Sequence, residues 1–549
     1  MKNAILRALL LLMLALPGIV SAQDKRPNVL LIVADDMGWS DAGVYGGEIF
    51  TPNINRLANQ GYQFLNFHVG SMCAPTRSML MTGVDNHVVG LGNMAELLAE
   101  NQRGKPGYEG RLNGRAVTIA TLLHDAGYHT YMAGKWHLGY TRDSLPASNG
   151  FEQSFILAEG GADNYEKKSY TPGYPTVHFF DGLNEAQLPP DFYSSKSYTD
   201  KIIGWIDANK ADGKPFFAYL AFQAVHQPLQ VSDEFVRRYL STYEAGWTNI
   251  KNFRYQREVQ LGIMPAGLTL KTPAIIPDWN SLPADERRMD AKRMAVYAGM
   301  LEYMDMSIGR VLEYLKQKGM LDNTIVVFMS DNGGEAHELM DHFPDYYAKN
   351  FNLTYEHLGQ KGSYVEYGPA WANVSMTPFS SFKSSASEGG VRAPFIISYP
   401  KAVPMGRRSD AFASVVDVVP TILQFTDTKA SSNSPPLAGR SMVSLLTGQS
   451  AQVYPGDVSI SQELSGGAAV YQGDYKLVRD CPPYGDRKWH LYNLKTDPTE
   501  STDIASAEPA RVQEMTEAYA EYVKNNGVIE VPDDYSINGQ AIKNVKMKH

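Results

Sequence analysis

The sequence predicts an α/β fold in which helices cover both faces of a large, mostly parallel sheet. Several nearly continuous apolar runs end abruptly at polar residues, and such runs suit strands that are buried on both faces. Helical patterns lie between these runs, and alternating strands and helices are typical of a parallel sheet. The 549 residues, 44% hydrophobic and 20% charged, are enough for a large core.

Five apolar runs define the strands in chain order. They cover residues 28–34, a short stretch ending near Gly134, and residues 216–222, 324–329 and 393–400. In such sheets, ligands collect beyond the carboxyl ends of the strands. The polar residues that follow the first four runs are therefore candidates for a functional site.

Two helices between these strands have clear signals. In residues 51–61, Thr51 is a candidate N-cap, Pro52 suits the first helical position and Gly61 ends the helix. Residues 293–318 carry apolar side chains at helical spacing, with Gly319 after them. Residues 231–286 and 335–381 are rich in aromatic residues and proline and fit this alternation poorly. We expect the second stretch to form a pocket wall, whereas a pocket wall and a surface insertion stay equally open for the first.

A smaller C-terminal subdomain is predicted after a loop over residues 429–436. Two antiparallel strands meet at a turn of Gly473 and Asp474, and a helix over residues 509–524 follows. We place the catalytic domain at residues 23–450 and the C-terminal subdomain and tail at residues 451–549.

The first 22 residues have the pattern of a cleavable secretory signal peptide. Lys2 and Arg7 precede or flank an apolar run, and small residues lead to a cleavage site after Ala22. The apolar run is short for an uncleaved anchor, and no later segment resembles a membrane span. We therefore expect a periplasmic or secreted protein. The net charge of −9 and the absence of a basic stripe argue against nucleic acid as a partner.

A candidate metal site consists of Asp35, Asp36, Asp331 and Asn332, which follow two of the predicted strands. Each pair alone would suit a turn or a helix cap. Buried carboxylates need a positive partner, however, and an all-oxygen set suits Ca²⁺, with Mg²⁺ the lesser alternative, rather than Zn²⁺.

Residues 71–83 read SMCAPTRSMLMTG and contain Cys73, one of only two cysteines. The segment from Cys73 through Arg77 to Gly83 closely resembles the sulfatase signature, in which this cysteine is oxidised to Cα-formylglycine. Further stretches, including DDMGWSDAGVYGG, GKWHLG, SDNGG and EGGVRAP, resemble landmarks of the same family in the same order, closest to its bacterial arylsulfatase branch. A disulfide to Cys481 stays open from sequence alone; otherwise Cys481 is a lone thiol in the core.

The resemblance implies an alkaline-phosphatase-like sandwich and a set of site residues. One Ca²⁺ per chain would be bound by Asp35, Asp36, the modified Cys73, Asp331 and Asn332. The implied catalytic residues are Cys73, Arg77, Lys135, His137, His226, Asp331 and Lys383, with Lys361 as a competitor for the last position.

The chemistry of sulfate transfer explains why such a set is needed. A thiol attacking sulfur would leave an adduct with no easy release, whereas a hydrated aldehyde attacks with one hydroxyl and expels sulfate by re-forming its carbonyl. We expect Arg77 to hold residue 73, Lys135 and Lys383 to clamp the sulfate oxygens and a metal to act as Lewis acid.

The proton transfers are assigned to three further residues. Asp331 would accept the proton of the nucleophile, and His226, shared with Lys383, would protonate the departing oxygen. His137 would take the proton of the hemiacetal hydroxyl in the release step.

The sequence thus predicts hydrolysis of sulfate monoesters, with aryl sulfates favoured because a phenol leaves easily and residues 343–382 offer aromatic side chains. Three alternatives stay open: a phosphate or phosphonate monoester hydrolase, an alkyl or sugar sulfatase, and a noncatalytic calcium-stabilised binding protein. The expected partners are a small-molecule sulfate ester, a formylglycine-generating maturation enzyme and the export machinery.

Overall fold

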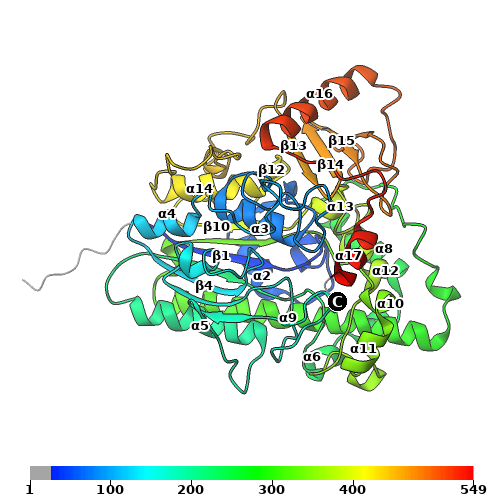
Figure 1. The fold of residues 1–549 in the computed structure, drawn as a ribbon, viewed down its shortest axis with the longest axis horizontal. Helices are drawn as coiled ribbons and strands as arrows, with labels where there is room; N and C mark the ends of the chain where they lie inside the picture. The colour runs from blue at the N-terminus through cyan, green and yellow to red at the C-terminus, as the bar shows by residue number, and fades with distance from the viewer. Residues whose placement is uncertain (1–25, 548–549) are drawn as a thin grey trace, which may run out of the picture.

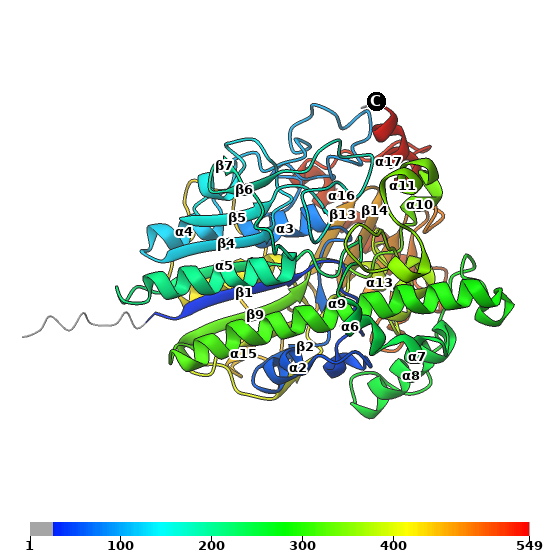
Figure 2. The same cartoon turned by 90° about the horizontal axis from the view of Figure 1, so that it is seen from below.

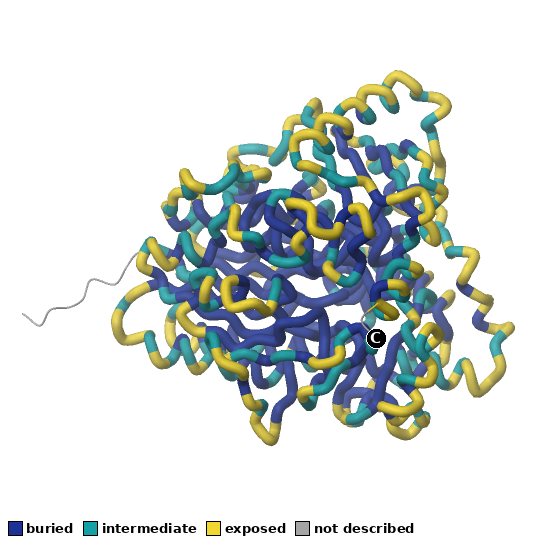
Figure 3. Tube along the Cα trace, viewed as in Figure 1, coloured by how far each residue is buried: buried dark blue, intermediate teal, exposed yellow. Residues whose placement is uncertain are grey.

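A computed structural model describes residues 26–547, and the proposed signal peptide lies outside this range. Its centre is a ten-stranded sheet with the order β11-β2-β10-β9-β1-β8-β4-β5-β6-β7 (Figure 1). Figure 3 shows that the central sheet is buried while the peripheral loops and helix surfaces are exposed. Within this range, no helix is long and apolar enough to cross a membrane.

Five adjacent parallel strands form the middle of the sheet. They are β9 (Thr324–Ser330), β1 (Asn28–Ala34), β8 (Phe216–Ala221), β4 (His129–Lys135) and β5 (Gln153–Leu157). Antiparallel pairs lie toward both edges, where β10 (Phe395–Ser398) joins β9 to β2 (Tyr62–Phe64), and β6 (Phe179–Asp181) joins β5 to β7 (Asn184–Glu185). The edge strand β11 (Arg407–Ser409) runs parallel to β2. The predicted strands are confirmed, with the parallel character confined mainly to the centre.

Each face of the sheet packs on its own layer of helices. Along β1, Leu30 and Ile32 enter one core while Leu31 and Val33 enter the other, as the alternation of a strand requires. The first layer contains α2 (Pro52–Asn59), α5 (Ser194–Asn209) and α9 (Ala284–Gln317), and the second contains α3 (Cys73–Thr82), α4 (Ile119–Asp125) and α14 (Val418–Phe425). Figure 2 shows α5 and α9 running alongside the strands.

Two details of the predicted helices differ in the structure. The helix expected from residue 293 begins at Ala284, nine residues earlier, directly after Pro283. Thr51 occupies the N-cap position of α2 but makes no capping hydrogen bond; its hydroxyl accepts instead from the backbone N–H of Gly43. The hydroxyl also donates to Asn55 Oδ1 at 3.3 Å, so it joins the preceding loop to the helix without capping a backbone N–H of the helix.

The two aromatic-rich stretches fold into short helices. Residues 231–286 contain α6 (Asp233–Arg237), α7 (Leu240–Tyr243) and α8 (Trp247–Gln260), and residues 335–381 contain α10 (Leu339–His342), α11 (Pro344–Asn350) and α12 (Gly368–Ser375). Trp247, Trp279 and Trp371 pack edge to face. Residues of the first stretch therefore join the main core. For residues 231–286 this favours an insertion that packs on the central sandwich over a pocket wall.

The C-terminal region forms a four-stranded antiparallel sheet with α16 (Pro509–Asn526) against it. Its strands are β13 (Ser459–Leu464), β14 (Gly467–Gln472), β15 (Tyr475–Arg479) and β16 (His490–Asn493). The turn at Gly473 and Asp474 and the helix are confirmed; β13 and a last helix, α17 (Ile537–Lys546), were not predicted. The domain boundary at residue 450 stays a prediction.

Small elements complete the described chain. Strands β3 (Phe67–His68) and β12 (Ala413–Ser414) pair in parallel, and α13 (Glu388–Val391) and α15 (Val443–Leu446) are single turns. On α13, Glu388 accepts from Lys476 of β15 at 2.9 Å, and Lys476 also lies 2.9 Å from Glu500. This fully buried ion cluster joins the C-terminal sheet to the large sandwich.

Candidate active site

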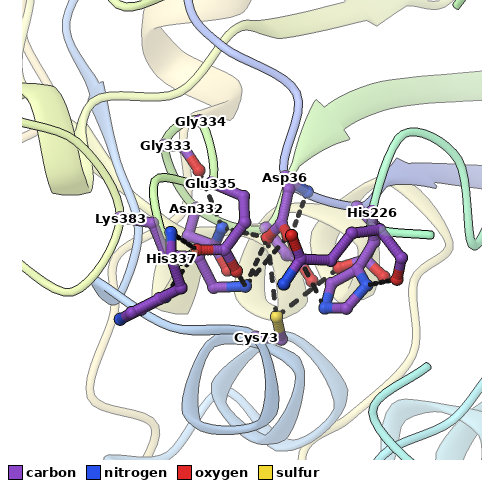
Figure 4. Close-up of polar contacts among 12 residues, drawn as sticks. Asp36, Cys73, His226, Asn332, Gly333, Gly334, Glu335, His337 and Lys383 are labelled. Carbon is purple, nitrogen blue, oxygen red and sulfur yellow. Dashed lines mark hydrogen bonds and ion pairs between the residues drawn. The ribbon is translucent and has the colours of Figure 1, made fainter. Parts of the chain in front are cut away.

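The register of the central strands brings the predicted metal ligands together. Ala34 of β1 is aligned with Ser330 of β9, so the residues that follow both strands emerge at the same point. Figure 4 shows Asp36, Asn332 and Cys73 pointing toward one another, with His226 to one side and Lys383 to the other.

The carboxylates form a closely spaced and fully buried group. Ligand atoms of Asp35, Asp36, Cys73 and Asp331 all lie within 4.8 Å of one another. The amide of Asn332 donates to Asp36 Oδ1 at 2.6 Å, whereas its buried Oδ1 has no hydrogen-bond partner. An unpaired buried acceptor is costly, and a bound cation would satisfy it.

The electrostatics of the group also fit a cation. Burial raises the pKa of Asp35 to about 8 although Lys135 opposes the shift, and burial also raises the pKa of Asp36 against the effect of Lys383. The two lysines alone therefore leave these carboxylates short of positive charge. Three carboxylates and an amide oxygen match the ligands that Ca²⁺ prefers.

Cys73 begins α3 and faces this group. Met72 is the N-cap and Pro75 lies in the first turn, where its missing N–H costs no helical hydrogen bond. The sulfur lies 3.5 Å from Asp35 Oδ1 and 3.8 Å from Asp36 Oδ1. Burial and the charge of Asp331 raise the pKa of the thiol well above its usual value. An unmodified Cys73 would thus stay protonated and be a poor nucleophile.

Arg77, one turn later on α3, ties the helix to the strand ends. Its Nε and Nη2 lie 2.8 and 2.7 Å from Asp331 Oδ2, and its Nη1 donates to the carbonyl of Lys135 at 2.9 Å. Burial alone would raise the pKa of Asp331, but Arg77 and the neighbouring lysines lower it. Asp331 is therefore ionised in this arrangement.

Both predicted sulfate-binding lysines point into the same group. Lys135 Nζ lies 2.7 Å from Asp35 Oδ2, and Lys383 Nζ lies 2.8 Å from Asp36 Oδ1. The backbone N–H of Lys383 donates to the carbonyl of Gly334, so its segment is attached to the loop after β9. Lys361 is instead exposed, beside Glu166, and the structure places Lys383 at the site.

The two predicted histidines lie on the side of the site that faces the solvent-accessible cavity. The Nδ1 of His226 contacts the carbonyl of Gln227, so this nitrogen carries the hydrogen, and Nε2 lies 3.7 Å from Asp36 Oδ2. Burial, with Lys135 and Lys383, lowers the pKa of His226 well below 6.5. The ring is neutral here, with the Nε2 lone pair facing the site.

His137 has a different environment. Neither ring nitrogen has a hydrogen-bond partner, and the nearest acid is Glu96, whose Oε1 lies 3.8 Å from Nε2. Burial lowers the pKa of His137 although Glu96 opposes the shift. A neutral imidazole with an available nitrogen can accept a proton.

Sequence reasoning missed two acidic residues at the site. Glu335 Oε2 lies 2.7 Å from Lys383 Nζ, while its Oε1 accepts from His337. Glu96 faces His137 and accepts from Tyr174 at 2.6 Å. Glu335 directly follows the SDNGG stretch, and this position could have identified it as a site residue. Glu96 lies in a loop in which no motif indicates a site residue.

A cavity of about 150 Å³ opens above Cys73. His137, His226 and Lys383 lie at its base, and most of its exposed wall is apolar. Of residues 343–382, the wall includes Phe343, whereas Tyr347, Phe351 and Tyr364 pack against one another. The start of the predicted pocket wall, residues 335–343, does line the cavity. The later aromatic side chains pack either in this small cluster or in the main core.

Comparison with family models identifies the class of this protein. The sulfatase family model matches residues 27–428, and a model of the C-terminal region of N-sulphoglucosamine sulphohydrolase matches residues 383–526. The chain therefore belongs to the sulfatase family.

Individual relatives agree with this assignment. An uncharacterized sulfatase of Schizosaccharomyces pombe is 38% identical over 542 residues, covering 94% of this chain and 96% of its own length. An arylsulfatase of Klebsiella aerogenes is 39% identical over 414 residues, covering 74% of this chain and 88% of its own. A crystal structure of Ps i-CgsB in complex with k-i-k-neocarrahexaose matches with a TM-score of 0.66 and 24% identity, covering 95% of this chain and 98% of that one, and supports the fold. Cys73 and Cys481 do not form a disulfide in the structure, so the disulfide alternative is wrong.

Proposed function

We propose that this sulfatase hydrolyses aryl sulfate monoesters, using Cys73 after its oxidation to formylglycine as the nucleophile. The observation that carries the proposal is the position of Cys73: it begins a helix, within hydrogen-bonding range of Asp35 and Asp36, and lies at the base of an apolar cavity. Its thiol is held protonated there, so the position suits a modified side chain better than a cysteine nucleophile.

The metal that we propose is Ca²⁺, with Mg²⁺ the lesser alternative. The oxygens of Asp35, Asp36, Asp331 and Asn332, together with residue 73, would hold it, and the unpaired Oδ1 of Asn332 supports this assignment. When bound, the ion would supply Lewis-acid stabilisation of negative charge.

The first chemical step would use one hydroxyl of the hydrated aldehyde. It attacks sulfur while the bond from sulfur to the ester oxygen breaks, and Asp331 accepts the proton of the attacking hydroxyl. Arg77 fixes Asp331 through its two contacts. Lys135 and Lys383, which contact Asp35 and Asp36 in the structure, would turn their ammonium groups toward the sulfate oxygens.

The departing oxygen needs a proton unless the leaving group is a good phenol. The neutral His226 keeps its hydrogen on Nδ1 toward Gln227, so we assign the larger share of this transfer to the protonated Lys383. In the release step, His137 would take the proton of the remaining hydroxyl of residue 73. The carbonyl then re-forms and sulfate leaves.

The aryl preference draws on the apolar wall of the cavity and on the likeness to a protein named arylsulfatase. The sulfatase assignment itself is tested by comparing kcat/KM for 4-nitrophenyl sulfate and 4-nitrophenyl phosphate with matured, calcium-loaded protein. We expect the sulfate to be the better substrate by more than about tenfold. A preference for the phosphate would overturn the assignment in favour of a phosphate or phosphonate ester hydrolase.

We also propose that the chain is exported and matured before folding. The signal-peptide pattern of residues 1–22 supports export to the periplasm or the exterior. Burial of Cys73, which is 2% exposed, supports oxidation by a formylglycine-generating enzyme on the unfolded chain. N-terminal sequencing of the secreted protein should begin at Gln23.

A further inference from the structure

The last helix of the described chain, α17, forms one wall of the cavity above Cys73. Ile537, Ala541, Ile542 and Val545 all line this cavity, together with Asn538 and Asn544, and the spacing of the four apolar residues places them on one face of the helix. Figures 1 and 2 both show α17 beside α10, whose C-terminal neighbour Phe343 lines the cavity as well. Segments distant in the sequence therefore enclose one pocket.

The helix is fixed to the catalytic domain rather than lying loosely on it. The buried Asn544 donates to the carbonyl oxygens of Glu96 and Leu98 at 2.8 and 3.2 Å, and Arg103 donates to Asn544 Oδ1 at 2.6 Å. At the other end, Ser536 caps the helix by accepting from Gly539. Glu96 is the acid that faces His137, so the helix is connected to the reaction site itself.

Most of the exposed wall of this pocket is apolar, and polar atoms in its lining that have no partner, such as those of His137 and Ser384, are themselves buried. The side-chain amide of Asn544 donates to the loop that contains Glu96. Glu335 is paired with Lys383, and Tyr174 donates to Glu96. A sugar bound against α17 would lose its hydrogen bonds to water without gaining equivalent ones. An apolar ring would instead bury surface at no such cost.

We propose that α17 is a specificity-determining element whose apolar face receives the leaving group of the ester. It selects uncharged, ring-bearing phenols and alcohols and discriminates against sugar sulfates. This inference rests on the proposed function, since it assumes that the ester oxygen departs into the cavity above residue 73.

The test uses Ile542→Gln, which keeps a side chain of similar length but makes the wall polar. Matured wild type should hydrolyse 2-naphthyl sulfate with a higher kcat/KM than galactose 6-sulfate. The variant should lose about tenfold or more in kcat/KM for 2-naphthyl sulfate. The inhibition constant of inorganic sulfate should not change, because sulfate does not reach the helix. Lys543→Ala, on the exposed face of α17, is the matched control and should behave as wild type.

A second variant distinguishes a loss of specificity from a folding defect. Ala541→Phe adds volume to the same wall without adding polarity, and should lower kcat/KM for 2-naphthyl sulfate more than for the smaller phenyl sulfate. Equal changes for both esters in both variants, no change in either, or a wild-type preference for galactose 6-sulfate would overturn the proposal.

The wall can also be tested without catalysis. By calorimetry, 2-naphthol should bind wild type more tightly than Ile542→Gln by about tenfold. If the protein hydrolyses no sulfate ester but shows this difference in binding, the proposed function is refuted while the role of α17 in binding a ring stands. Equal binding to the two proteins would refute the role of α17 alone.

Discussion

The Nζ of Lys135 lies 2.7 Å from Oδ2 of Asp35, and both side chains are fully buried. The contact exists because β4 and β1 flank β8 in the sheet, so that both strands deliver a polar side chain to the same edge. The contact places an ammonium group at a carboxylate that we propose as a metal ligand, so a bound divalent ion would compete with this lysine and leave its ammonium group for an anionic substrate. Several consequences can be measured.

The first prediction concerns the proposed metal. Asp36→Ala should lose bound Ca²⁺ and lower kcat/KM by more than about 100-fold, because a ligand is removed and Lys383 loses its partner. Metal content by mass spectrometry and kinetics on the same preparation provide the check. Asp457→Ala, at an exposed position, is the control. Full activity of Asp36→Ala in a calcium-free preparation would contradict the metal assignment.

The second prediction concerns turnover. Cys73→Ser should transfer sulfate once at most and then stall, because a serine ester has no second hydroxyl with which to expel sulfate. Intact-protein mass spectrometry after incubation with 4-nitrophenyl sulfate should show a persistent sulfate adduct. Sustained turnover by this variant, expressed where serine is not oxidised, would be incompatible with the hydrate mechanism.

The third prediction concerns Glu335 as a positioning residue for Lys383. Glu335→Gln should lower kcat/KM by about tenfold, and Lys383→Ala by more, because the glutamate holds the ammonium that would bind sulfate. In Lys383→Ala, the further change Glu335→Gln should have almost no effect. Fully additive losses in this double-mutant cycle would show that Glu335 acts separately from Lys383.

The fourth prediction concerns stability and pH at the junction with the C-terminal sheet. Burial would lower the pKa of His87, but hydrogen bonds to Asp85 and Glu463 outweigh it and raise the pKa to about 9. Since the folded-state pKa is raised above 6.5, this stabilisation is fully present below pH 6.5 and is lost as the pH rises through about 9.

The measurement is the free energy of unfolding in urea on both sides of this window. Between pH 6.5 and pH values above 9, wild type should lose about 3 kcal/mol more than His87→Gln. The difference between the two proteins isolates His87 from other titrating groups. Parallel pH profiles would mean that His87 is not charged in the folded protein.

The sequence predicted the central strands and the residues after them because buried parallel strands have an unambiguous pattern. Asp35 and Asn332 could be placed at one edge of the sheet from this pattern alone. The motif around Cys73 added the nucleophile, and Lys383 could be chosen only by resemblance. Its contact with Glu335 depends on two loops whose path no local signal fixes.

The pocket wall could not be predicted for a different reason. Its apolar surface comes from residues such as Met94, Tyr170 and Ile542, which lie in separate loops and in α17. The short helix α17 has too few residues for a decisive periodicity, and its position depends on Asn544 binding a distant loop. The aromatic range 343–382 looked more suitable by composition, but most of its side chains pack in a separate small cluster or in the main core.

The most direct test of the central claim is the mass of the peptide that contains residue 73, taken from fully active protein. We expect a peptide in which a carbonyl oxygen has replaced the sulfur and two hydrogens of Cys73, and which reacts with a hydrazide as an aldehyde does. An unmodified cysteine peptide from protein with full sulfatase activity would contradict the account.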